Sequence, residues 1–246
     1  AWKLISREST NVDAFLTPSV YYKDFFLSKT GISGHNFHVI PLGFDPGELT
    51  KIEKKDNYPS VGYYCRINSQ NGFDKLVDAF IQLKSSNNLP GLTLHVSGGY
   101  TGDDKPFISE QIRKIKASGF KSFIRIYPEF QGNSKLEFFS NIDVMSVPVR
   151  KHDGYGLYIL EANAAGVPVV QPATGAFPEI IDRTIGGITY FPDNISELAA
   201  ALLKLLNDNE LRLKLGKEGK ANVLKELSLN KMSEGLSRVY NSLNNP

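Results

Sequence analysis

The apolar positions of the chain follow two alternating patterns from about residue 58 onward. Short continuous apolar runs are typical of strands that are buried on both faces of a sheet. They predict strands at Val61–Tyr64, Leu92–Ser97, Phe123–Ile126, Val144–Val149, Val167–Val170 and Ile188–Phe191. Between them, segments with the helical period of about 3.6 residues predict helices at Phe73–Lys84, Phe107–Ala117, Lys135–Ser140, Leu157–Ala165 and Ile195–Asn207.

This alternation predicts the α/β class, with a Rossmann-like, open and mostly parallel sheet that carries helices on both faces. Such sheets bind ligands at the carboxyl ends of their strands. Residues 1–44 predict helix, strand, helix and strand, which is too little for a stable sheet by itself. Residues 45–57 contain Pro46, Gly47 and a charged run. The remaining predicted elements are strands Val12–Leu16 and Phe37–Ile40 and helices Val20–Lys29, Glu210–Lys225 and Leu229–Leu243.

Composition narrows the class of protein without naming a function. An apolar content of 41% with 22% charged residues is ordinary for a globular protein, and a net charge of +2 does not indicate a nucleic-acid partner. Cys65 is the one cysteine, so an intramolecular disulfide is excluded, and the four histidines show no metal spacing. We expect a cytoplasmic protein, or one peripheral to a membrane through a part outside this chain. Because the chain starts at Ala1 within apparent structure, we expect a fragment of a longer protein.

The loop 150–156, between a predicted strand and a predicted helix, carries the first candidate chemistry. Gly154 and Gly156 allow close approach of the backbone to a ligand, and the following helix start directs N–H groups at an anion. Arg150 and Lys151 either add charge to this site or belong to a solvated loop. Glu161 lies among small apolar residues of the helix and can accept two hydroxyl donors, as from a ribose diol. The alternative is an exposed helix glutamate.

The run from Asp153 to Ala162, continued by Ala165–Val170, resembles the E-x7-E signature of glycosyltransferase family 4 (glycosyl transferases group 1). The segment Gly175–Ile181 resembles the next block of that family, at the family's spacing. The family comprises retaining enzymes of the GT-B fold that use nucleotide-sugar donors. The resemblance therefore implies a hexosyltransferase-type enzyme. It divides the chain into a remnant of the N-terminal acceptor domain (1–44), a linker (45–57), the C-terminal donor-binding domain (58–225) and a terminal crossover helix (226–246).

The resemblance also implies roles for individual residues. Glu161 matches the glutamate that binds the nucleotide ribose. Asp153 stands at the first glutamate of the signature, the catalytic carboxylate at the donor sugar, and is shorter by one methylene; its alternative role is an N-cap of the next helix. No metal ion or other cofactor is expected, because cations and a helix dipole stabilise the leaving phosphate. The donor diphosphate is expected at the helix start, comprising Gly154, Tyr155, Gly156 and Leu157.

The segment 65–74 resembles the Arg…Glu-Lys-Gly phosphate loop of the family. Arg66 is kept, but Asn71 occupies the lysine position and Gln70 the glutamate position, so one of two expected cations is missing. A lost charge-assisted contact costs on the order of 1.5–3 kcal/mol. The alternative role of Asn71, with Asp74, is to cap the following helix. Loops after two other strands are expected to flank the nucleobase, and two aromatic residues there either stack on it or belong to the core, namely Tyr127 and Phe130.

Two other classes of function remain to be weighed. A non-catalytic nucleotide-sugar-binding module would explain Asn71 and Asp153 as marks of a decayed site. A dinucleotide-dependent oxidoreductase is disfavoured, because Ile159 stands where a third glycine of the fingerprint would lie. The partners expected are a nucleotide-sugar donor, an acceptor of unknown class and the N-terminal domain of the same protein. We expect the chain alone to bind donor weakly and to transfer no sugar.

Overall fold

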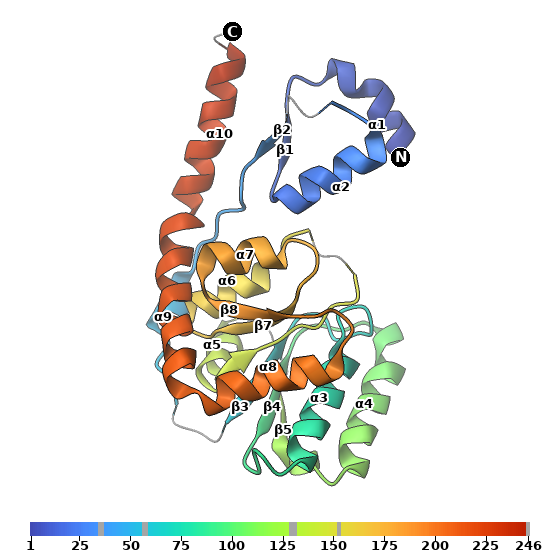
Figure 1. Cartoon of the computed structure of the whole chain (residues 1–246), viewed down its shortest axis with the longest axis vertical. Coiled ribbons are helices and arrows are strands. Elements are labelled where there is room, and N and C mark those ends of the chain that lie inside the picture. The colour runs from blue at the N-terminus through green and yellow to red at the C-terminus, as the bar shows by residue number, and fades with distance from the viewer. Residues whose placement is uncertain (34–36, 56–58, 128–131, 152–153, 245–246) are drawn as a thin grey trace.

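The computed structural model describes residues 1–33, 37–55, 59–127, 132–151 and 154–244, which form a larger and a smaller unit (Figure 1). The larger unit contains a six-stranded, wholly parallel sheet in the order β5-β4-β3-β6-β7-β8. Its strands are β3 Ser60–Tyr64, β4 Thr93–Ser97, β5 Ile124–Tyr127, β6 Val144–Met145, β7 Val169–Pro172 and β8 Gly187–Tyr190. Its helices are α3 Phe73–Ser85, α4 Lys105–Ala117, α5 Gly132–Ser140, α6 Leu157–Ala164, α7 Phe177–Thr184, α8 Ile195–Asn207 and α9 Asn209–Glu226.

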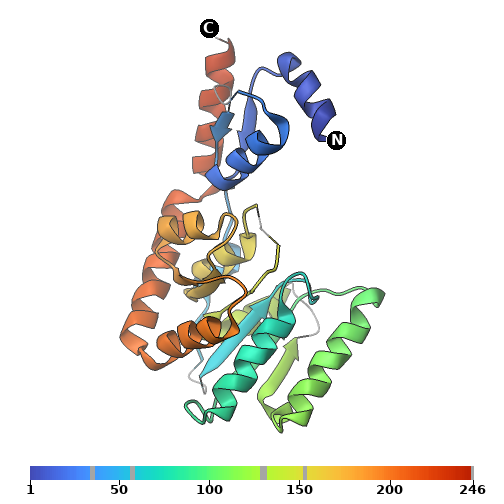
Figure 2. The same cartoon turned by 45° about the vertical axis from the view of Figure 1, so that its right-hand side comes forward.

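Helices cover both faces of this sheet. Helix α3 packs against α4 and α8 over one face, whereas α5, α6 and α7 lie over the other (Figures 1 and 2). The chain winds outward from β3 to β5 and then restarts at β6, directly beside β3. The order of the strands therefore reverses between β3 and β6, which is where open parallel sheets bind ligands. The predicted fold class is confirmed.

Strand β3 is buried along its whole length, as expected for a central strand covered on both faces. The sequence predicts an apolar stripe on α3 comprising Phe73, Leu76, Val77, Phe80 and Ile81; the first four are almost completely buried, and Ile81 is partly buried against the same core. Burying one such side chain contributes roughly 1.5–3 kcal/mol. Gly62 has a packing role on the other face, since a Cβ atom there would lie 2.9 Å from the Phe138 ring.

Several elements differ from the predicted bounds by one to four residues, and three differences have clear local reasons. Strand β6 has only two residues, because after Met145 the chain turns towards the loop that follows β3, and Pro148 has no N–H to donate. Strand β7 starts at Val169 instead of Val167, since Val167 N donates to Ala162 O at 2.8 Å and closes the end of α6. Helix α7 is an addition to the predicted elements, with a proline in its first turn, where proline is favoured.

The smaller unit contains α1 Trp2–Glu8, β1 Phe15–Thr17, α2 Val20–Thr30 and β2 Phe37–Val39, with β1 parallel to β2. Helix α2 begins at the predicted Val20 and ends one residue after the predicted Lys29: Ser19 Oγ accepts from Tyr22 N at 3.1 Å, and Gly31 closes the helix with φ of 68°. Aromatic rings hold the unit together, with Phe15 stacked on Phe37 at 4.7 Å between ring centroids.

Two passages of chain join the units. Residues 40–46 descend from β2, and α10 Leu229–Asn244 rises beside the smaller unit (Figure 2). The passages touch where Phe44 N donates to Leu227 O at 2.8 Å. Gly43 is required at this crossing, because a Cβ atom there would lie 2.7 Å from Leu229 Cα.

A buried histidine in β4 makes the stability of the larger unit depend on pH. His95 is 5% exposed, its Nδ1 lies 2.9 Å from Tyr127 Oη, and its Nε2 lies 3.1 Å from Thr93 Oγ1. Burial, followed by the positive charges of Arg125 and Lys54, lowers the pKa of His95 to about 4. The imidazole is therefore neutral in the folded protein at pH 5, where most of the unfolded chains carry it protonated.

We expect His95→Gln to remove part of the acid sensitivity of the fold. The unfolded chain binds a proton at a pKa near 6.5 and the folded chain does not, so stability falls as pH decreases towards 4. Between pH 7 and 4.5 this group accounts for on the order of 2–3 kcal/mol. Urea unfolding at pH 7, 5.5 and 4.5 measures the difference between the two proteins. Equal pH dependence in both would contradict the assignment.

Candidate functional site

The loops after β3 and β6 meet at the point where the strand order reverses. Gly72 has φ of 72°, and a Cβ atom there would lie 2.6 Å from the carbonyl carbon of Pro148 and closer still to its oxygen. In the same contact, Arg150 N donates to Gln70 O at 2.9 Å. The segment predicted to hold phosphate and the loop before α6 therefore form one surface at the carboxyl edge of the sheet.

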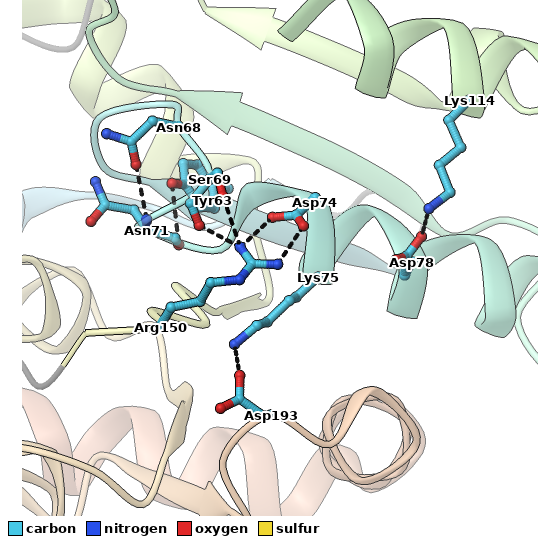
Figure 3. A network of polar contacts seen from close by, with 10 residues as sticks. All are labelled: Tyr63, Asn68, Ser69, Asn71, Asp74, Lys75, Asp78, Lys114, Arg150 and Asp193. Carbon is cyan, nitrogen blue, oxygen red and sulfur yellow. Dashed lines mark hydrogen bonds and ion pairs between the residues drawn. The ribbon is translucent and has the colours of Figure 1, made fainter. Parts of the chain in front are cut away.

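Arg150 fastens these two loops together (Figure 3). Its guanidinium binds both carboxylate oxygens of Asp74, with Nη1 at 2.7 Å from Oδ1, and also donates to the carbonyl of Ser69. Burial raises the pKa of Asp74, but the hydrogen bond and charge of Arg150 outweigh burial and hold that pKa below its usual value. The buried Lys75 makes a similar link to Asp193, after β8. The charge of Arg150 is thus largely balanced by Asp74.

Arg66 is anchored on one side and open on the other. Its Nε and Nη2 atoms lie 3.1 and 3.0 Å from Asp104 Oδ2, and Nη2 donates to Thr101 Oγ1 at 3.0 Å. The side chain is 52% exposed, and within the described part of the chain Nη1 has no hydrogen bond. A guanidinium held in this way keeps donors available for an anion without losing much side-chain freedom on binding.

Asn71 does not cap α3, so that alternative from the sequence is wrong. The N-cap residue is Gly72, and no side chain caps this helix. Asn71 instead closes its own loop. Its Nδ2 donates to Arg66 O at 2.9 Å. Its backbone N donates to Asn68 Oδ1 at 2.9 Å (Figure 3). The Asn71 side chain is thus used within the loop, and Gly72, with φ of 72°, takes the N-cap position.

The start of α6 has the geometry that the sequence predicts for an anion site. Gly156 is the N-cap residue with φ of 86°, and no side chain of the residues that the structure describes caps the helix. A Cβ atom on Gly156 would lie 2.7 Å from the Phe177 ring, so a larger residue is excluded for steric reasons as well. Leu157 is half exposed in the first turn. Asp153, the predicted catalytic carboxylate, lies outside the described residues.

Tyr155 and Gly154 connect this helix start to the smaller unit. Tyr155 is buried, its hydroxyl donates to Leu42 O at 3.2 Å, and burial raises its pKa to about 12. Gly154 O accepts from Ser19 Oγ at 3.0 Å. The Tyr155 side chain therefore supports the loop from behind, and any contact of this residue with a ligand would come from its backbone.

A second contact between the units was missed by the sequence analysis. Glu179 of α7 accepts hydrogen bonds from the backbone N–H groups of Val20 and Tyr21, at 2.8 and 2.5 Å, and so caps α2 from the other unit. Neither residue type nor spacing signals a cap supplied by a side chain more than a hundred positions away. The contact holds α2 over the start of α6.

Glu161 lies on α6 at the same edge of the sheet, and its partner was also missed. Its Oε1 forms an ion pair with the ammonium group of Lys135, from α5. The glutamate side chain is 18% exposed, so the interpretation as an ordinary surface glutamate is wrong. No hydrogen bond to Oε2 exists among the described residues, which leaves this oxygen able to accept a ligand hydroxyl.

The remaining candidates belong to the framework of the site. Tyr127 is buried and bonded to His95, so it is a core residue, and Phe130 lies outside the described residues. The backbone at Gly98 passes so close to β3 that a Cβ atom there would lie 2.7 Å from the Cys65 carbonyl carbon. Across residues 1–33, 37–55, 59–127, 132–151 and 154–244, no cluster of three or more candidate metal ligands was found. No helix in those ranges combines the length and apolar character needed to cross a membrane.

Comparison with known proteins gives consistent matches over the whole chain. The family model described as "Glycosyl transferases group 1" matches residues 47–222. A GDP-mannose-dependent monoacylated alpha-(1-6)-phosphatidylinositol monomannoside mannosyltransferase of Corynebacterium glutamicum is 26% identical, over 98% of this chain and 67% of its own length. The lipopolysaccharide core biosynthesis mannosyltransferase LpsB of Rhizobium meliloti is 28% identical, over 82% and 54%. The chain thus spans about half to two thirds of these relatives.

Solved structures agree with the fold. Anabaena Alr3699/HepE in complex with UDP superposes with a TM-score of 0.84 at 18% identity, covering 98% of this chain and 68% of that one. The C-terminal domain of a glycosyl transferase group 1 family protein (LpcC) from Francisella tularensis matches 76% of this chain and 95% of its own, with a TM-score of 0.62 and 25% identity. The structural neighbours are GT-B glycosyltransferases. Since the family model covers most of the chain, this protein belongs to the glycosyl transferases group 1 family.

Proposed function

We propose that this chain is the donor-binding part of a retaining glycosyltransferase of family 4, which transfers a hexose from a nucleotide-sugar donor to an acceptor. Residues 58–225 would bind the donor, 45–57 would link the domains, and 226–246 would cross back to the acceptor domain, of which 1–44 is the last part. The cytoplasmic location, with or without attachment to a membrane surface, stays a prediction.

The observation that carries the proposal is the position of Glu161. It lies at the carboxyl edge of the sheet, beside the reversal of strand order, with one carboxylate oxygen unbonded among the described residues. Gly156 opens an uncapped helix start in the same surface, and Arg66 offers a guanidinium at the end of the adjacent strand. A ribose diol on Glu161 and a diphosphate between the helix start and Arg66 match this arrangement of acceptor and donors.

The relatives support a nucleotide-sugar donor and leave its base open. The corynebacterial relative is described as GDP-mannose-dependent, whereas HepE was crystallised with UDP. In our proposal, Asp153 acts at the donor sugar, and the departing phosphate is stabilised by Arg66 and the dipole of α6 without a metal ion. In the same proposal, the donor diphosphate is contacted by backbone groups of Gly154, Tyr155 and Leu157. The side chain of Asn71 adds an uncharged contact.

Calorimetric titration of the chain with UDP, GDP and ADP tests the proposal. We expect saturable binding of one nucleotide, weak because one phosphate-binding cation is absent, and no sugar transfer without the acceptor domain. Binding of none of the three, repeated on the full-length protein, would refute a nucleotide-sugar site. Detectable transfer by the 246-residue chain alone would contradict the proposed division of labour between the domains.

We expect Asn71→Lys to strengthen nucleotide binding roughly tenfold, because it restores a charge-assisted contact to the diphosphate. Asn71→Gln, which keeps the residue neutral, serves as the control. Isothermal titration at two salt concentrations checks the physical cause, since the gain should shrink as salt rises. An equal gain in the glutamine variant would show that charge is not responsible.

Asn71 favours a second candidate function, a nucleotide-sugar-binding module that has lost catalysis. Its supporting observation is that the Asn71 side chain is bonded to Arg66 O, so the loop presents no cation there. In the full-length protein, the decayed-site hypothesis predicts activity only after Asn71→Lys and Asp153→Glu. The enzyme hypothesis predicts activity in the unmodified protein.

A further inference from the structure

Helix α5 brings an unexpected cation to the site. Lys135 lies one turn before Phe138 and Phe139, both of which are fully buried. The Phe138 and Phe139 rings pack on Tyr64 at the end of β3, with ring centroids 5.5 and 5.1 Å apart. Side chains three and four residues apart share a face of a helix, so this packing fixes where Lys135 points.

The ammonium group of Lys135 meets Glu161 in a partly enclosed position. The two side chains are 23% and 18% exposed, and the contact joins α5 to α6 across 26 positions of sequence. The Lys135 Nζ atom also lies 6.0 Å from the Tyr64 ring centroid. Burial and then the negative charge of Glu161 raise the pKa of Tyr64, as expected for a carboxylate close to that phenol. The ion pair therefore lies beside the aromatic ring of Tyr64.

We infer that Lys135 is a positioning residue of the donor site, which holds Glu161 with one carboxylate oxygen turned to the nucleotide and completes a charged clamp around the ribose diol. The inference rests on the proposed function, since it takes Glu161 as the ribose ligand. A carboxylate offers about four acceptor positions and an ammonium group three donors, so their mutual contact leaves capacity on both. Ribose hydroxyls, which donate and accept, can use both partners, whereas a deoxyribose loses one of these contacts.

The test combines variants of Lys135 with ribonucleotides and 2′-deoxynucleotides. UDP and GDP are titrated into the 246-residue protein, and the better ligand is then compared with its 2′-deoxy analogue. For the wild-type protein we expect the deoxy analogue to bind roughly tenfold more weakly, the size of one lost charge-assisted hydrogen bond. In Lys135→Met we expect roughly tenfold weaker ribonucleotide binding, with most of the discrimination against the deoxy form lost.

Two further variants separate positioning from general stability. Lys135→Arg keeps the charge and should stay within about threefold of wild type. Lys114→Met removes a partly exposed lysine that pairs with Asp78 between α3 and α4, away from Glu161, and should change nothing. If Lys135→Met does not fold, as judged by its thermal unfolding, Lys135→Gln replaces it.

The outcomes distinguish this inference from the proposed function. If the wild-type protein binds nucleotide, and Lys135→Met binds it with the same affinity and the same discrimination against the deoxy form, the role of Lys135 is overturned. The donor site would then still stand. Failure of the wild-type protein to bind either nucleotide would overturn both, and it is seen before any variant is made. Loss of affinity with discrimination retained would show a purely structural lysine and would also overturn the inference.

Discussion

Gly72→Ala is expected to destabilise the protein by roughly 4 kcal/mol or more, a size that marks severe steric conflict. Two causes combine. The backbone of Gly72 has φ of 72°, which costs an L-residue about 1–2 kcal/mol. The added methyl group would also overlap the backbone carbonyl of Pro148, which no side-chain rotation relieves. The loops after β3 and β6 must then separate, and the nucleotide site should be lost with them.

Gly166→Ala is a matched control for this effect. Gly166 has φ of 74°, almost the same as Gly72, but a Cβ atom there would meet no atom within 4 Å. It should therefore show only the conformational cost, about 1–2 kcal/mol. Urea unfolding of both variants at one pH gives the difference directly. Equal destabilisation would show that the Pro148 contact relaxes freely and that the two loops are not held by it.

Replacing Glu161 should produce the largest loss of nucleotide binding. If its carboxylate accepts both ribose hydroxyls, Glu161→Ala removes two charge-assisted hydrogen bonds and should weaken binding of UDP or GDP by roughly a hundredfold. Glu161→Gln keeps the shape of the side chain but loses its charge. Its nucleotide affinity should lie between those of the wild type and Glu161→Ala. It also leaves Lys135 without its partner, so a modest loss of stability is expected in either variant.

Titration with inorganic pyrophosphate tests whether Glu161 acts on the ribose of the nucleotide. Pyrophosphate would contact Arg66 and the start of α6 but has no diol, so its affinity should be the same with and without Glu161. Glu234→Gln, which breaks an exposed pair with Lys231 on α10, is the control for removing a helix glutamate. Equal weakening of pyrophosphate and nucleotide would mean that Glu161 supports the fold of the site instead of binding ribose.

Elements with a complete local signal were predicted well. Helix α8 has the predicted bounds, because Asn194 accepts from Glu197 N at 3.0 Å and the apolar stripe runs through the last turn. Strand β6 was predicted too long, since an apolar run cannot show that the chain leaves the ladder after Ser146, whose N–H still donates to Gly62 O, and that Pro148 then meets Gly72. The pattern records burial, and residues 146–149 are buried as a loop.

The residues of the candidate site also differ in how far local sequence predicts them. Gly156 and Glu161 were chosen from local sequence, as a glycine before a helix and a carboxylate among small apolar helix residues, whereas Arg66 was chosen through the resemblance to the family's phosphate loop; their roles in binding stay predictions. The pairings Lys135–Glu161 and Asp74–Arg150 did not follow, since each joins loops or helices whose distance depends on the sheet order. Asn71 was misassigned as a cap because its side chain donates to Arg66 O, and Gly72 takes the N-cap position.

The double passage of chain at Gly43–Phe44 and Leu227–Leu229 has a mechanical consequence. Two segments bonded side by side resist stretching and sliding, so the easiest relative motion of the units is rotation about the crossing itself. The hydrogen bonds of Ser19 to Gly154 and of Glu179 to α2 form a separate connection between the units. A rotation about the crossing therefore has to break these hydrogen bonds, so the two connections together fix the orientation of the smaller unit relative to the start of α6.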